Sequence, residues 1–97
     1  MAEPKPDATP DPTVGRIVHY TLTDQDVARI ANDREQATGY GNVPHAGDLV
    51  PLIVVRVWDG RLVNGQVLLD GNDRLWVTSR AEGDDAGQWH YPVIVSA

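Results

Sequence analysis

The sequence predicts a mainly β domain with one helix, folded as a small open β-barrel or a curled antiparallel sheet. Residues 52–77, LIVVRVWDGRLVNGQVLLDGNDRLWV, read as three successive strands rich in Val, Ile, Leu and Trp. Asp59-Gly60 lies between two apolar runs, which is a strong hairpin signal. Short strands at this spacing, with one helical segment before them, predict the order strand, helix, then four strands.

The chain of 97 residues is predicted to hold one domain with an extended arm. Residues 1–15 are proline-rich and lack an apolar period, so they are assigned to the arm. Residues 16–97 form a single small β-barrel-like domain. There are no cysteines, which excludes a disulfide framework and a thiolate zinc site. The sequence has no long apolar run, so we expect neither a secretory signal peptide nor a membrane-spanning helix.

The first strand and the helix have local signals of their own. Residues 16–22 alternate, which directs Val18, Tyr20 and Leu22 to the core. Residues 23–36 are helical, with Thr23 as the N-cap. An apolar stripe docks this helix on the sheet, formed by Val27, Ile30 and Ala31.

The remaining segments are two loops and a C-terminal strand. Glycine and proline interrupt residues 38–48, which predicts a loop. Residues 81–87 form an acidic loop, and residues 88–91 a short strand with Trp89 directed inward and His90 outward. Residues 93–95 either close the barrel or extend as a tail.

The pairing register of the central strands determines which side chains face the core and which face the opposite side of the sheet. A two-residue turn at Asp59-Gly60 would place Asn64 and Gln66 on an otherwise apolar face. A three-residue loop, or a bulge at Gly65, would instead set Val57 opposite Val63 and Ile53 opposite Val67, and we favour the bulge. The predicted inner face is then Ile53, Val55, Val57, Val63, Val67, Leu69, Leu75 and Val77.

The opposite face has the composition of a recognition surface, because it combines large rings with polar groups that orient a ligand. Its central residues are Arg56, Trp58, Asn64, Gln66, Trp76, Thr78 and Arg80, and the flanking strands add His19 and His90. The alternative is that the tryptophans pack under the helix or a loop and that the polar groups are solvated.

No catalytic residue, metal site or cofactor is predicted. Residues 70–73, DGND, lack the ligand spacing of a calcium loop and are better explained as a turn. Ser79 lacks a nucleophile motif, and the acids of the 81–87 loop are not in a predicted cleft. The net charge is −6 with one lysine, so no basic patch for a nucleic-acid polymer is expected.

Five segments together resemble small proteins encoded by actinobacterial phages and prophages. They are GRIVHYTLT at 15–23, the GN…GD…P loop at 41–51, VNGQVLLDGND at 63–73, WVTS at 76–79 and GQWHYP at 87–92. The resemblance covers roughly residues 15–92 and implies an accessory or structural role in a virion or the host cytoplasm. It implies no catalytic residue.

We therefore expect a non-enzymatic protein–protein interaction module. Its partner would be itself, as a homo-oligomer, or another phage structural protein. The alternative function is capture of a small ligand, namely a host signalling nucleotide. A base would then stack on Trp58, Trp76 and His90, and phosphate would meet Arg56 or Arg80.

Overall fold

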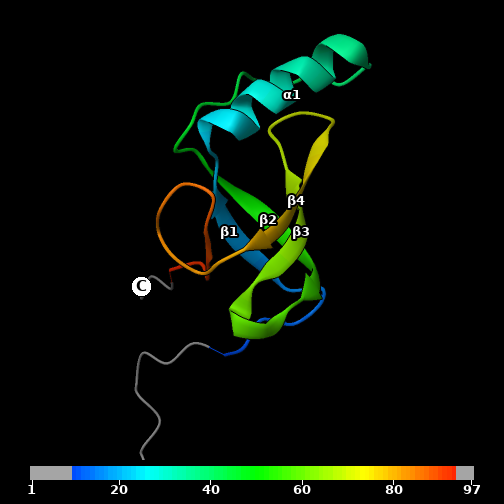
Figure 1. Ribbon diagram of the computed structural model, residues 1–97. Coiled ribbons are helices and arrows are strands. Elements are labelled where there is room, and N and C mark those ends of the chain that lie inside the picture. Colours follow the sequence, from blue (N-terminus) through cyan, green and yellow to red (C-terminus); the bar gives the residue numbers. More distant parts are fainter. Residues whose placement is uncertain (1–9, 94–97) are drawn as a thin grey trace, which may run out of the picture.

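The computed structural model describes residues 10–93 and shows a mainly β fold with one helix (Figure 1). Its elements follow the predicted order: β1 Ile17–Thr21, α1 Asp24–Gln36, β2 Leu49–Val57, the 3-10 turn η1 Asp59–Arg61, β3 Val63–Leu68, β4 Arg74–Arg80 and β5 Trp89–His90. The predicted fold class is confirmed. Residues 1–9 and 94–97 lie outside the described part, and with them most of the predicted segment 93–95.

The strands form one antiparallel sheet in the order β4-β3-β2-β1-β5. This sheet is curled but is not a closed barrel. The segment after β4 reaches β5 at the opposite edge through a single parallel bridge between Glu82 and Trp89. The Trp89 backbone N–H donates to Ala81 O at 3.0 Å, and the Gly83 N–H donates to Trp89 O at 2.8 Å. These bonds draw the two edges of the sheet toward each other.

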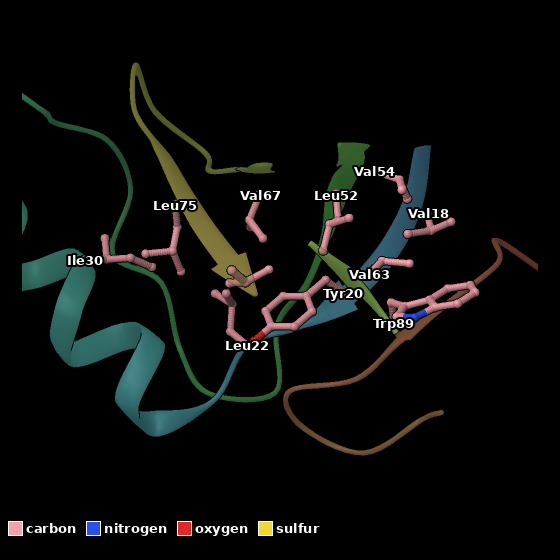
Figure 2. Packing of buried hydrophobic residues seen from close by; sticks show 11 residues of the cluster. Val18, Tyr20, Leu22, Ile30, Leu52, Val54, Val63, Val67, Leu75 and Trp89 are labelled. Carbon is pink, nitrogen blue, oxygen red and sulfur yellow. The ribbon is translucent and has the colours of Figure 1, made fainter. Parts of the chain in front are cut away.

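One face of the sheet and the helix enclose the core. Its fully or almost fully buried side chains are Val18, Tyr20, Leu22, Ile30, Leu52, Val54, Val63, Val67, Leu75, Val77 and Trp89. Figure 2 shows Ile30 of α1 approaching the sheet near Leu75, with Trp89 at the far end of the cluster. The inward positions predicted for the first strand and for Trp89 are confirmed. In the predicted helix stripe, Ile30 is buried and Val27 partly buried, whereas Ala31 is exposed.

The predicted face assignment of β2 is wrong up to the bulge and correct beyond it. Leu52 and Val54 point into the core, whereas Val55 is 43% exposed. Val57 lies on the same face as its partner Val63, as predicted, although it is 37% exposed. Ile53 is only partly buried and pairs with Gln66, not with Val67. The predicted pairing of Val57 with Val63 is correct. On β3 and β4 the predicted inward residues Val63, Val67, Leu75 and Val77 are confirmed, and Leu69 packs against the core.

The bulge itself explains this inversion. The extra residue is in β2, at Val55, because Val54 pairs with Gly65 and Arg56 with Asn64. A bulge reverses the side-chain alternation on one side of it. Gly65 is a glycine for a different reason, since a Cβ atom there would overlap with the side chain of Leu52. The sequence-based prediction therefore places the irregularity in the wrong one of the two paired strands.

The helix begins at a complete capping box. The Asp26 backbone N–H donates to Thr23 Oγ1 at 2.9 Å, and the Thr23 N–H donates to Asp26 Oδ2 at 3.0 Å. The same Oδ2 accepts a hydrogen bond of 2.6 Å from the buried Tyr20 hydroxyl. One carboxylate therefore joins the start of α1 to β1.

A polar clasp joins the end of α1, the following loop and the β3–β4 turn. The Arg34 guanidinium binds both carboxylate oxygens of Asp73, at 2.7 and 3.1 Å, and donates to Asn42 O at 3.0 Å. Gly41 and Gly71 form an isolated bridge in which a Cβ atom on either would overlap with backbone of the other segment. Residues 70–73 are therefore the turn that the sequence predicts, fixed in place by the loop.

Candidate functional site

The candidate site is the outer face of the sheet, opposite the core. Strand pairing defines it by the outward positions Ile17, His19 and Thr21 of β1, Leu49, Pro51, Ile53, Val55 and Arg56 of β2, Asn64, Gln66 and Leu68 of β3, Arg74, Trp76 and Thr78 of β4, and His90 of β5. Trp58 belongs to it as well, because its indole N–H donates to Asn64 Oδ1 at 3.0 Å.

Large apolar side chains are exposed across this face. Ile17 and Leu49 are 54% and 51% exposed, Trp76 is 49%, Trp58 is 44%, and Val55 and Leu68 are 43% and 39%. An antiparallel sheet with one solvated face normally alternates apolar and polar residues. Since α1 packs against the core side through Ile30, none of the described elements covers these six side chains.

The charges of the outer face are opposite to those of the chain as a whole. The protein carries a net charge of −6. Nevertheless, no outward strand position holds a carboxylate, and the charged or titratable ones are Arg56, Arg74, His19 and His90. Within residues 10–93, the carboxylate side chains lie in the helix, the turns and the loops. The outer face is thus apolar with scattered cationic groups, and it suits an apolar or anionic partner.

Asn64 is the structural centre of this face. β2 bulges at Val55 on one side of it, and β4 bulges on the other, where Ser79 has a φ of 52°. The Ser79 backbone N–H donates to Asn64 Oδ1 at 2.7 Å, and Trp58 Nε1–H donates to the same oxygen. The predicted recognition residue Asn64 is therefore largely buried, 9% exposed, and positions Trp58 instead of meeting a ligand.

The two exposed tryptophans are on the same face, as predicted. Trp76 pairs with Gln66 across β4 and β3, and Gln66 pairs in turn with Ile53. The Arg56 guanidinium lies over the Trp58 ring, 4.7 Å from its centroid. Thr78 also points outward and is exposed. The alternative in which both tryptophans are buried is thereby excluded for the described chain.

The two histidines meet at the edge formed by β1 and β5. His19 pairs directly with His90, and their rings lie edge to face with centroids 5.8 Å apart. His90 Nδ1 is buried without a hydrogen-bond partner and lies 3.7 Å from a carboxylate oxygen of the exposed Asp84. The sequence placed both histidines on one face, and the structure brings them into contact.

Arg80 departs from the predicted face. It pairs with the core residue Val63, and its guanidinium lies over the Tyr20 ring at 5.8 Å and 3.8 Å from Asp26 Oδ1. The bulge at Ser79 causes this turn inward. Burial, followed by the hydrogen bond to Asp26, raises the pKa of Tyr20 well above its usual value, so its hydroxyl remains a donor. Arg80 supports the core and cannot meet a ligand on the outer face.

Several apolar residues of the outer face were missed by the sequence-based prediction. The prediction assigns Ile53 and Val55 to the core and does not single out Leu49 and Leu68, whereas it places Ile17 outward, as the structure does. The run LIVV at 52–55 carried the signal, because uninterrupted apolar residues in a strand indicate that both of its faces are apolar.

A hollow lies at the end of the sheet beside Trp58. It has a volume of about 250 Å³ and is lined by Asp11, Pro12, Val57, Trp58, Gly60 and Arg61. The Arg61 guanidinium binds Glu82 with two hydrogen bonds, Asp11 Oδ1 at 2.9 Å and the Pro10 carbonyl at 3.1 Å. The N-terminal segment from Pro10 onward is therefore bound to the domain, with Pro12 buried.

Residues 10–93 contain neither a cluster of metal-binding side chains nor a membrane-spanning helix. No group of three or more histidine or acidic side chains in this range is placed to hold a metal ion. No helix in the described part of the chain is long and apolar enough to cross a membrane.

The outer face is thus the most distinctive surface of residues 10–93, and its geometry is the basis for inferring a function. No protein-family model matches the chain, and neither the curated proteins nor the solved structures yielded a match to it.

Proposed function

We propose that the protein is a non-enzymatic interaction module that associates with a second copy of itself through the outer face of its sheet. The observation that carries the proposal is the set of six exposed apolar side chains, among them Trp58 and Trp76. Contiguous exposed apolar surface bordered by polar groups is typical of protein–protein contacts. A virion or the host cytoplasm is the setting that the resemblance to phage proteins implies.

The composition of the face fits a protein interface. Aromatic residues and arginine are enriched at the centre of interfaces, whereas acidic residues are depleted there. Trp76 is a suitable anchor because it is exposed, lies in a paired strand and has Gln66 beside it to orient a partner. Such anchors account for most of the binding free energy.

Sedimentation equilibrium over a concentration series tests the proposal. We expect a mass above that of the monomer, and we expect Trp76→Ala to weaken association by at least about 2 kcal/mol, roughly a thirtyfold rise in Kd. Because the contact is mainly apolar, raising the salt concentration should change Kd little.

Tyr40→Ala is the matched control, since Tyr40 is 71% exposed and lies in the loop after α1, outside the outward strand positions. It should leave the mass unchanged. A monomer at every concentration, or equal effects of Trp76→Ala and Tyr40→Ala, would contradict the proposal.

Capture of a nucleotide is the second candidate, and one observation favours it. The outer face lacks carboxylates and carries Arg56 beside the Trp58 ring, a pairing that suits a phosphate next to a stacked base. Titration with a panel of nucleotides, followed by tryptophan fluorescence, separates the candidates. Saturable quenching that disappears in Trp58→Ala and weakens with salt would support capture, and no response to any nucleotide would exclude it.

A further inference from the structure

We infer that two copies of the protein meet across one row of outer-face side chains, with the two-fold axis of the dimer lying along that row. The row crosses four strands through directly paired residues: Trp76 of β4, Gln66 of β3, Ile53 of β2 and Ile17 of β1. This inference rests on the proposed function and adds to it which residues of one copy face which residues of the other.

Symmetry sets a condition on the residues that lie on such an axis. In a two-fold interface, each of them faces its own counterpart in the other copy. A charged side chain would meet the same charge there, whereas an apolar side chain can pack against itself. An amide is also compatible with itself, because it both donates and accepts hydrogen bonds. Gln66 and the three apolar residues of the row therefore all meet the condition.

The neighbouring rows do not meet it. On one side, Arg74 pairs with Leu68, and an axis there would set the two copies of Arg74 against each other. On the other side lies Arg56 of β2, and an axis there would do the same to this arginine. The pair of Thr21 and Leu49 is uncharged but spans only β1 and β2. The row through Gln66 is thus the one uncharged row that crosses four strands of the described sheet.

An axis along this row also keeps the cations of the two copies apart. Rotation about it brings residues that precede the row in one copy opposite residues that follow it in the other. Arg74, two positions before Trp76, comes opposite the uncharged Thr78 of the other copy. An axis parallel to the strands would instead set Trp76 against Ile17. It would also bring Arg74 to His19, which is cationic when protonated, and contacts between like charges weaken association.

The exposure of the row suits contact between two curled sheets. β2 and β3 are the inner strands of the row, so Ile53 and Gln66 meet first when two outer faces approach. The gap widens toward the flanks, where Ile17 and Trp76 are 54% and 49% exposed and extend into it. The row can therefore pack along its whole length.

Exchange of charge at position 66 tests the axis in the full chain. Gln66→Glu and Gln66→Lys each set like charges against each other in the dimer of that variant, so each should raise Kd at least about tenfold. An equimolar mixture sets glutamate against lysine, and its Kd should lie at least about tenfold below that of either variant alone. Sedimentation equilibrium at one total concentration measures all three samples, and circular dichroism establishes that both variants are folded.

Two further pairs of variants complete the experiment. Ile53→Glu with Ile53→Lys lies in the same row and should behave in the same way, which keeps the test decisive if a charge at position 66 prevents folding. Leu68→Glu with Leu68→Lys is the matched control, on the same strand and face as Gln66 but one row away. The axis separates the two copies of residue 68 by about 13 Å along the strands, beyond the Debye length of about 8 Å. Mixing the Leu68 variants should therefore leave Kd unchanged.

The axis and the proposed interface fail separately in these measurements. If mixing the charge variants at positions 66 and 53 lowers Kd no more than mixing the Leu68 variants, the inference is overturned. Stronger rescue by Gln66→Glu mixed with Ile53→Lys overturns it too, because the axis would then run parallel to the strands. In both cases, a dimer that Trp76→Ala weakens leaves the outer-face interface standing. An unmodified protein that is monomeric at every concentration overturns both.

Discussion

Asn64 accepts two hydrogen bonds with one side-chain oxygen, between two strands that both bulge beside it. Its partners are the Ser79 backbone N–H, which the bulge in β4 frees from strand pairing, and Trp58 Nε1–H. A buried donor without a partner costs about 1–3 kcal/mol. The amide therefore has a structural role, and it also fixes the ring that the outer face presents.

Asn64→Ala should lower the free energy of unfolding by about 2–4 kcal/mol, because it leaves two donors unsatisfied. It should also release Trp58, seen as a change in the indole N–H chemical shift. Gln66→Ala is the matched control on the same strand and face, and we expect it to cost less than about 1 kcal/mol in urea unfolding. Equal costs would show that Asn64 has no special role.

Val54 and Val55 are neighbours with opposite surroundings, and they test the observed register. Val54 is fully buried and Val55 is 43% exposed. Val54→Asp should prevent folding, since an unpaired buried carboxylate costs several kcal/mol. Val55→Asp should change stability by no more than about 1 kcal/mol. Melting curves of both variants, followed by circular dichroism, distinguish the two registers. If Val55→Asp prevented folding and Val54→Asp were tolerated, the register favoured from the sequence would be correct.

At the scale of elements, the clasp at the end of α1 makes stability depend on pH. The hydrogen bonds from Arg34 hold the pKa of Asp73 below its usual value, and the same pair raises the pKa of Arg34. A carboxyl group with a lowered folded-state pKa stabilises the fold above its unfolded pKa, about 3.9 for aspartate. That contribution is lost as the pH falls through the lowered value.

Asp73→Asn should therefore cost stability at pH 7, by about 1 kcal/mol because the pair is near the surface. The difference from the unmodified protein should shrink as the pH falls from about 4 toward 2. Urea unfolding at several pH values measures it. Asp33→Asn is the control, since Asp33 is 57% exposed and 3.9 Å from Arg29, and its effect should be within about 0.5 kcal/mol at both ends. A difference independent of pH would contradict the linkage.

Elements with local signals could be predicted from the sequence, and those set by a partner strand could not. Thr23 caps α1 through atoms within three residues, so the start of the helix follows from its own sequence. The inward side of β1 follows from simple alternation. The phase of β2, by contrast, depends on an extra residue whose position is decided by packing of Leu52 against Gly65 in another strand.

The candidate site shows the same division. The prediction places Trp58 and Trp76 on one face correctly. Trp76 lies in β4 before its bulge, and Trp58 follows the bulge in β2, beyond which the predicted pairing of Val57 with Val63 holds. Arg80 was misplaced by the bulge at Ser79, a residue with no sequence feature that announces a positive φ. Because the prediction directs Ile53 and Val55 of β2 inward, it leaves these two apolar residues out of the outer face. The arginine clasp was missed because Arg34 and Asp73 are 39 residues apart and ordinary in their own surroundings.

At the scale of the whole molecule, the domain extends further toward the N-terminus than composition predicts. Within the described residues, Pro10 and Asp11 already contact Arg61, whereas composition places the boundary of the arm at residue 15. A variant without residues 1–9 keeps the buried Pro12 and the Asp11–Arg61 pair, and it is the reference for a variant without residues 1–13. Removing residues 1–13 should cost about 1–2 kcal/mol, because Pro12 burial and the Asp11–Arg61 pair are lost.

For a domain of this size that cost corresponds to a fall in melting temperature of roughly 4–16 °C. Scanning calorimetry of the two truncated variants compares them directly. An equal, small shift in both would mean that residues 10–13 add nothing to stability and that the whole segment is a separate arm.

The contacts of Arg61 also set the order in which the chain can finish folding during synthesis. Its guanidinium holds Asp11 while being fixed by Glu82, and its carbonyl accepts the Trp89 indole N–H at 3.1 Å. Ribosomes add about 5–20 residues per second, so residue 89 follows residue 61 by a few seconds, long after a hairpin can form. The segment around Asp11 thus leaves the ribosome before Arg61 and finds its final place only after Glu82 and Trp89 have fixed that arginine. For those seconds, this segment and the hollow beside Trp58 are both open to neighbouring chains on the same messenger.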